Sequence, residues 1–84
     1  MLKADGLNGA IIGVGSRCGQ KDVIVYDVEK VVEILMTRDG MTYEEAEEFF
    51  DFNIGGGWHG EETPIWMRPY DIDDIEIEGE EVWN

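Results

Sequence analysis

The sequence predicts an α+β fold in which a small antiparallel sheet, a β-hairpin plus a later strand, carries two helices packed on one face. Three observations support this class. β-branched residues cluster at residues 10–15 and 22–26, apolar residues recur with a helical period from residue 28, and Thr42 carries a capping signal for a second helix. The expected element order is β-β-α-α-β, and 84 residues suffice for one domain.

The first two strands are expected to form a hairpin. Apolar side chains occupy both odd and even positions in residues 10–15 (Ala-Ile-Ile-Gly-Val-Gly) and 22–26 (Asp-Val-Ile-Val-Tyr). This pattern is typical of strands buried on both faces. The six residues between them, 16–21, are polar, include a glycine and are long enough only for a turn, so antiparallel pairing is predicted. Residues 1–8 show no pattern and are expected to form a loose lead-in.

The first helix is expected to begin after Asp27, whose carboxylate can accept hydrogen bonds from the exposed amides of the first turn. Gly40 is suited to the left-handed conformation that closes a helix. The i, i+3, i+4, i+7 spacing of one helix face is met by Val28, Val31, Val32 and Leu35.

The second helix is expected to begin after Thr42, because Glu45 follows three residues later at the spacing of a capping box. Asn53 and the three glycines at 55–57 end it, since consecutive glycines lose too much entropy in a helix. Its predicted inward stripe consists of Ala46, Phe49, Phe50 and Asn53.

A third strand is predicted at residues 63–67 (Thr-Pro-Ile-Trp-Met). Pro64 has no N–H to donate, so this strand starts there or lies at a sheet edge. The folded domain is therefore expected to span residues 1–70, followed by an acidic C-terminal tail at 71–84.

This tail is expected to be solvated and mobile through Val82-Trp83-Asn84. The alternative is a short added strand at residues 74–78, where Ile75 and Ile77 partly alternate with acidic residues.

The charge is distributed unevenly along the chain. Residues 1–41 hold six of the 20 acidic residues and five of the 6 basic ones, a net charge of −1. Residues 42–84 hold fourteen acids and one base, Arg68, a net charge of −13, and the two halves sum to −14. An acidic surface repels nucleic acid and anionic lipid and attracts basic proteins. Direct nucleic-acid or membrane binding is therefore disfavoured, and the charge serves either a basic partner or solubility alone.

The compartment expected from the sequence is the cytoplasm. Cys18 is the only cysteine, so no disulfide can form within the chain. The first residues lack the apolar core of a signal peptide, and no apolar run has the length needed to span a bilayer.

No enzymatic activity and no cofactor are expected. The glycines at 13–15 precede a strand, whereas a phosphate-binding loop must precede a helix. Cys18 lies beside Arg17 and near Lys21, a basic setting that favours a reactive thiol, but the only histidine, His59, lies in a different loop. A structural or incidental cysteine is the expected interpretation.

No metal site is expected either. His59 with Glu61 and Glu62 offers one nitrogen and several oxygens, which is a weak ligand set for zinc, and the order of an EF-hand loop is absent.

The acidic side of the second helix, the glycine turn and the tail form the candidate partner-binding surface. Carboxylates one helical turn apart, about 5.4 Å along the axis, are spaced much like phosphates along a nucleic-acid strand. The helix is therefore either a nucleic-acid mimic for a basic groove or a plain solvated face. Trp58 is expected to be a core anchor, with an exposed interface aromatic as the alternative. The candidate residues are Glu44, Glu47, Glu48, Asp51, Trp58, Glu61, Glu62, Asp73, Asp74, Glu76 and Glu78.

Residues 36–46 (Met-Thr-Arg-Asp-Gly-Met-Thr-Tyr-Glu-Glu-Ala), Phe52-Asn53 and 60–64 (Gly-Glu-Glu-Thr-Pro) resemble small uncharacterised proteins encoded by tailed bacteriophages. The resemblance runs from about Ala10 to Met67, is most specific in the turn that leads to Gly-Glu-x-Thr-Pro, and does not include the tail. It brings no established activity and no functional residues. It implies a protein of the host-cell cytoplasm, where small phage proteins often inhibit host machinery, including defence nucleases such as CRISPR complexes.

Two candidate functions follow. The first is a non-enzymatic, phage-type protein that inhibits a basic host protein through the acidic helix and tail, by nucleic-acid mimicry. The second is a structural or accessory protein that forms homo-oligomers through the turn around Trp58 and the edge of the third strand.

Overall fold

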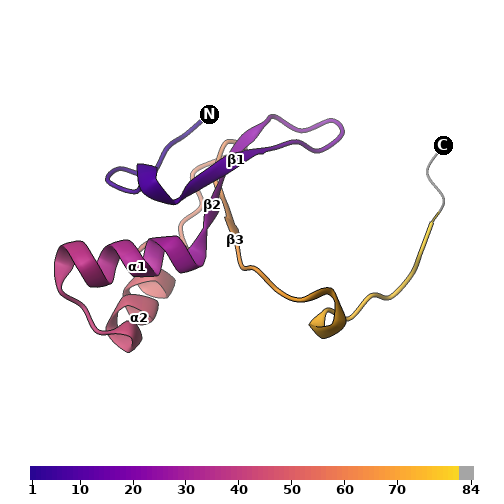
Figure 1. Cartoon of the computed structure of the whole chain (residues 1–84). Helices are drawn as coiled ribbons and strands as arrows, with labels where there is room; N and C mark the ends of the chain where they lie inside the picture. The colour runs from indigo at the N-terminus through magenta and orange to yellow at the C-terminus, as the bar shows by residue number, and fades with distance from the viewer. Residues whose placement is uncertain (82–84) are drawn as a thin grey trace.

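The structure, a computed structural model, describes residues 1–81 and places a three-stranded sheet beside two helices (Figure 1). The strands are β1 (Ile11–Gly15), β2 (Val23–Asp27) and β3 (Ile65–Met67), and the helices are α1 (Val28–Asp39) and α2 (Tyr43–Asn53). Two short 3-10 helices lie at Asn8–Ala10 and Ile72–Asp74. The predicted α+β class and the order β-β-α-α-β are confirmed. The predicted end of the tail, Val82-Trp83-Asn84, lies outside the described residues.

The sheet is mixed, so the prediction of a wholly antiparallel sheet was wrong for its third strand. β1 and β2 pair antiparallel as expected, with an irregular register between Ile11 and Gly13. β3 instead runs parallel to β2, with Trp66 beside Tyr26. The reason is that β2 leads directly into α1, and the helix pair and glycine turn return the chain to a point beside Val25 in the middle of β2. β1 and β3 are therefore the two edges of the sheet.

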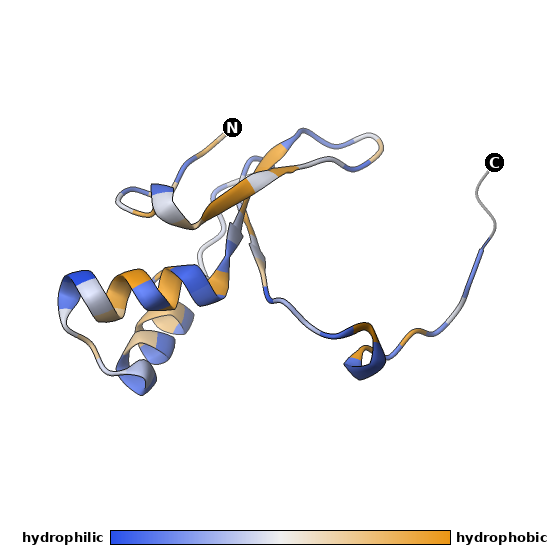
Figure 2. Ribbon diagram, viewed as in Figure 1, coloured by the Kyte–Doolittle hydropathy of each residue, from blue (hydrophilic) through white to orange (hydrophobic). Residues whose placement is uncertain are grey.

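The core lies where β2, β3 and the two helices meet. The Tyr26 ring is fully buried and stacks on Trp66 with the ring centroids 4.8 Å apart. Phe50 of α2 meets the same tryptophan edge-on at 5.3 Å. Figure 2 shows apolar residues along β1 and β2 and in bands along α1. The other buried members of this cluster are Leu7, Ala10, Val28, Val31, Val32, Leu35 and Ala46.

Both helices begin and end where their local signals predict. The Asp27 carboxylate accepts a hydrogen bond of 2.9 Å from the Glu29 amide, and Gly40 closes α1 with a φ of 70°. At the start of α2, the Thr42 hydroxyl accepts from the Glu45 amide at 3.2 Å, and the Glu45 carboxylate accepts from the Thr42 amide at 3.0 Å. This capping box sets where α2 begins and therefore which residues form its outer face.

Residues 1–8 do not form the loose lead-in expected from the sequence. Leu7 is buried, the Ala4 amide donates a hydrogen bond of 2.8 Å to the hydroxyl of the core tyrosine, and the Met1 amine pairs with Glu62 at 3.0 Å. These are single long-range contacts without a repeating period, so the sequence pattern could not reveal them.

The predictions of burial for β1 and for one side of α2 were wrong. β1 is not buried on both faces, because Ile12 is 43% and Val14 is 55% exposed. The helix α1 packs against β2, and Ile12 and Val14 of β1 lie outside the buried cluster. In α2 the predicted inward residues Phe49 and Asn53 are exposed, while the other two positions of the stripe are buried. α2 packs on its neighbours along a narrower stripe than its sequence suggests.

Phe50→Ala is expected to reduce the free energy of unfolding by about 3–5 kcal/mol, because it empties a buried aromatic position. Phe52 lies two residues later in α2 and is 85% exposed. Phe52→Ala is therefore a matched control, with an expected change within about 0.5 kcal/mol. Urea unfolding followed by circular dichroism measures both values. Equal losses in the two variants would contradict this packing of α2.

Candidate functional site

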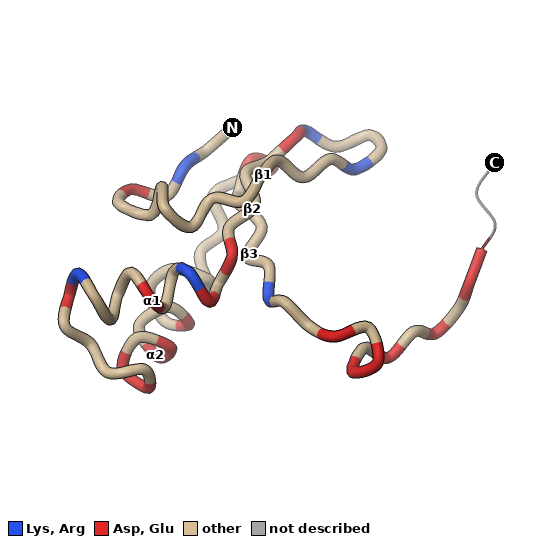
Figure 3. The backbone as a smooth tube through the Cα atoms, viewed as in Figure 1, with Lys and Arg blue, Asp and Glu red and all other residues tan. Residues whose placement is uncertain are grey.

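The candidate surface combines the outer face of α2 with the segment that follows β3. Figure 3 shows acidic residues along both, with basic residues sparse beside them. Glu44, Glu48 and Asp51 are exposed, and Glu47 is half-buried. The periodic acidic residues of the sequence thus lie on a formed helix.

Asp51 has a partner within the chain. The Arg68 guanidinium approaches its carboxylate at 3.4 Å and also lies over the Phe50 ring, 5.7 Å from the ring centroid. Arg68 is the one base of the second half of the sequence. The outer face of α2 is therefore neutralised at one point, which the sequence pattern did not show.

Glu47 has a partner as well. It accepts a hydrogen bond of 2.9 Å from the Tyr43 hydroxyl, and this bond raises the pKa of Tyr43 above its ordinary value of 10.0. Within residues 1–81, no side-chain hydrogen bond or ion pair involves Glu44 or Glu48. These two carboxylates are the part of the face that is available to a partner.

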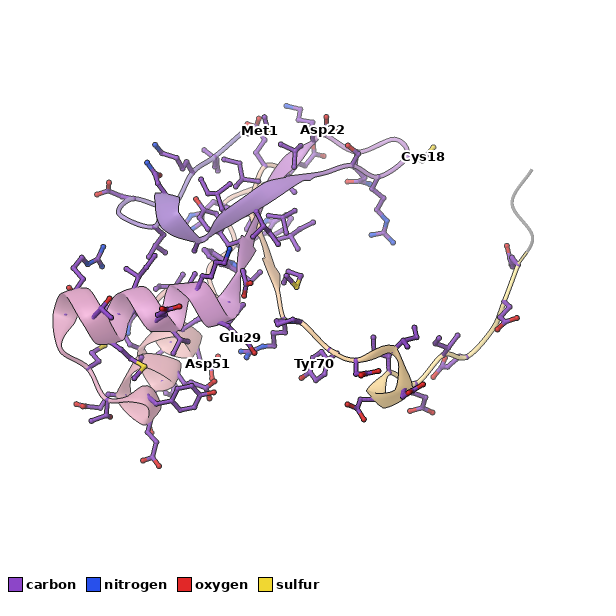
Figure 4. All side chains as sticks on the ribbon, viewed as in Figure 1. Met1, Cys18, Asp22, Glu29, Asp51 and Tyr70 are labelled. Atoms are coloured by element: carbon purple, nitrogen blue, oxygen red, sulfur yellow. The ribbon has the colours of Figure 1, made fainter. Side chains whose placement is uncertain are left out.

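Residues 68–70, which lead into the tail, lie against α2. A hollow of about 310 Å³ is lined by Tyr43 and Glu47 of α2, by the first turns of α1 and by residues 68–70. Figure 4 shows Glu29, Asp51 and Tyr70 around this junction. The acidic face of α2 and the acidic tail therefore meet at residues 68–70.

The tail leads away from the body of the domain (Figure 1). The Cα radius of gyration is 14.8 Å, whereas a compact chain of this length has about 12 Å. Asp71 caps the 3-10 helix by accepting from the Asp73 amide at 3.0 Å, and no strand forms at residues 74–78. The remaining candidate acids of the tail are all exposed: Asp73, Asp74, Glu76 and Glu78.

Trp58 is not the core anchor that we expected, since it is 76% exposed. Trp66 takes the core position through its pairing with β2. The turn around Trp58 is held by polar contacts instead. The Thr63 hydroxyl accepts from the His59 amide and donates to the Gly60 carbonyl, both at 2.7 Å. Trp58 is thereby presented to solvent as an exposed aromatic.

Glu61 and Glu62 differ in their surroundings. Glu61 is exposed, whereas Glu62 pairs with the Met1 amine, which lowers the pKa of its carboxyl. Among residues 1–81, no three His, Cys, Asp or Glu side chains are grouped so as to hold a metal ion. Cys18 lies exposed at the tip of the hairpin (Figure 4).

No protein-family model, curated protein or solved structure matches this chain. The function is therefore inferred from the chemistry of the surface. In the described part of the chain, each helix is too short or too polar to cross a membrane.

Sequence reasoning missed a hollow of about 690 Å³ between the N-terminal segment and the glycine turn. Its apolar walls include Leu7, Leu35 and Trp66. Arg38 also lines it, but its guanidinium is bonded to Asp39 and to the Gly6 carbonyl. Because the N-terminal segment was expected to be loose, no sequence signal indicated this hollow.

Glu45→Ala is expected to destabilise the domain at neutral pH and to have less effect as the pH falls. The pKa of Glu45 lies below its ordinary value of 4.5, because its carboxylate accepts from the Thr42 backbone amide and is also hydrogen-bonded to the Thr42 side chain. The stabilisation is therefore complete above pH 4.5 and is lost as the pH falls through the folded-state pKa.

Thermal unfolding of the wild type and this variant over a series of acidic buffers measures the effect. Glu48→Ala is the control, because Glu48 is exposed on α2 and has no side-chain partner in the described part of the chain. A loss in the Glu45 variant that stayed constant at every pH would contradict a role for the ionised carboxylate.

Proposed function

We propose that this chain is a small, non-enzymatic, acidic protein that binds the basic surface of a host protein and blocks its nucleic-acid site. The supporting observation is that the acidic face of α2 continues into the acidic tail at residues 68–70. At physiological ionic strength, interactions between exposed charges are largely screened beyond about 8 Å. Two acidic segments that meet act on a partner as one surface, whereas separated segments act independently.

Aromatic side chains among the acids support a protein partner. Phe52 is 85% and Tyr43 is 57% exposed on α2. Phe49 and Phe52 line a shallow hollow of about 340 Å³ together with Glu45 and Glu48. Exposed aromatics surrounded by polar groups are typical of the residues that dominate binding energy at protein interfaces. Charge would guide the encounter, and the aromatics would hold the complex.

Nucleic-acid mimicry is the mode of inhibition that we favour. The carboxylates of Glu44 and Glu48 lie one helical turn apart and have no partner in the described part of the chain, and the tail adds an exposed acidic run. A basic groove that binds phosphates would attract these groups by the same potential. The resemblance to phage proteins favours a bacterial host protein, such as a defence nuclease, as the target.

Glu44→Lys with Glu48→Lys is expected to abolish capture of basic proteins from a bacterial lysate by the tagged chain. The matched control is Asp22→Lys with Glu33→Lys, which changes the net charge equally at exposed positions on other elements. It should retain capture. Added DNA or RNA should release the captured protein if the two compete for one groove. Equal capture by both variants at moderate salt would refute the proposal, and release that nucleic acid fails to cause would refute mimicry.

Self-association is the second candidate function. Trp58 is 76% exposed, and Ile65 is 48% exposed on the edge strand β3. These side chains supply apolar surface beside an edge that can pair with another strand. Trp58→Ser should then lower the mass of the particle in light scattering. An unchanged mass would exclude this surface.

A further inference from the structure

We infer that residues 75–78 of the tail add as a strand to the free edge of β1 in a second copy of the chain. Each copy would donate its tail and accept that of its partner, which gives a dimer with two-fold symmetry. This inference uses the isoleucines of the tail, whereas the proposed binding of a basic protein uses its acids, and it does not involve the turn around Trp58. It does not depend on a basic partner.

The tail has the pattern of a strand but pairs with no strand within residues 1–81. Residues 75–78 read Ile-Glu-Ile-Glu, so the isoleucines share one face and the glutamates the other. Ile75 is 46% and Ile77 is 56% exposed. The backbone at Ile75 is already extended, with φ −97° and ψ 127°. Pairing would bury the isoleucines and leave the glutamates in water.

β1 offers the complementary edge. It pairs with β2 on one side only, so its other side presents backbone N–H and C=O groups that can receive a strand. Ile12 and Val14 are exposed on this strand, and there is no atom within 4 Å of the place where a side chain at Gly13 would begin. β1 thus exposes an apolar face and has open space at Gly13, next to the irregular register between Ile11 and Gly13.

Charge favours this pairing over others. The hairpin loop at 16–22 carries Arg17 and Lys21 against one acid, a net charge of +1. Residues 71–81 carry seven acids and no base, a net charge of −7. Figure 3 shows the two basic residues on the hairpin and the acids spread along the tail. The hairpin is therefore an electropositive site next to the free edge.

The fold directs the tail away from its own β1. It leaves the sheet at Met67, which pairs with Asp27 at the end of β2, so two strands separate it from the free edge. Arg68, just before the tail, then pairs with Asp51 of α2. Figure 1 shows the tail continuing outward from this point. A second copy can reach its isoleucines without disturbing either contact.

The test is the mass of the full-length chain by sedimentation equilibrium at moderate salt, where repulsion between two acidic chains is screened. The wild type is expected to show twice the 9.5 kDa of one chain. Ile75→Ser with Ile77→Ser should give a monomer. Ile72→Ser makes the same chemical change at a residue that is 65% exposed but lies in the 3-10 helix. It should remain a dimer.

Reversing the charges of the hairpin and then those of the tail tests whether these two segments lie side by side in the dimer. Arg17→Glu with Lys21→Glu should weaken the dimer roughly tenfold, and adding Glu76→Lys with Glu78→Lys should restore it. A monomeric wild type, or a dimer that persists in the Ile75 and Ile77 variant, would overturn the inference. A dimer lost only in Trp58→Ser would assign association to the Trp58 surface. Because Glu44 and Glu48 stay intact throughout, failure here leaves the proposed binding of a basic protein untouched.

Discussion

The contact between Tyr26 and Trp66 connects nearly every part of the fold. Tyr26 lies in β2, pairs with Ile11 of β1, stacks on Trp66 of β3 and binds the Ala4 amide of the N-terminal segment. Phe50 brings α2 to the same tryptophan. The fully buried Tyr26 and the partly buried Trp66 therefore join both outer strands, a helix and the N-terminal segment.

A core built around one aromatic pair is small, and this determines what remains on the surface. Within residues 1–81, ten hydrophobic residues are buried, and nine of them form one cluster. Apolar side chains on β1, on the outer side of α2 and along the tail are consequently left exposed. Exposed apolar groups of this kind mark interaction surfaces in soluble proteins. The same shortage of core that limits stability thus supplies the surfaces on which both proposals rest.

Local signals made the helices predictable, and long-range contacts limited the rest. The Thr42 capping box depends on residues three apart, so the sequence contains all of its information. Which of Trp58 and Trp66 enters the core depends on the register of β3 against β2, which no local pattern determines. The acidic face of α2 could be predicted from the helical spacing of its acids. The pairing of Asp51 with Arg68 joins residues 17 apart, so no local pattern indicates it. Sequence therefore predicted the charges of the site but not which of them are neutralised.

That neutralisation gives Arg68 a structural role within an acidic surface. Fourteen acids crowd the second half of the chain, and without a base the tail would be repelled from α2. Arg68 pairs with Asp51 and lies over the Phe50 ring, so the acidic tail starts beside the acidic helix. The pair is exposed and contributes little to stability by itself. Its effect is on geometry, because it brings two like-charged segments into one surface. Within residues 1–81, Glu44 and Glu48 have no side-chain partner and can bind another protein.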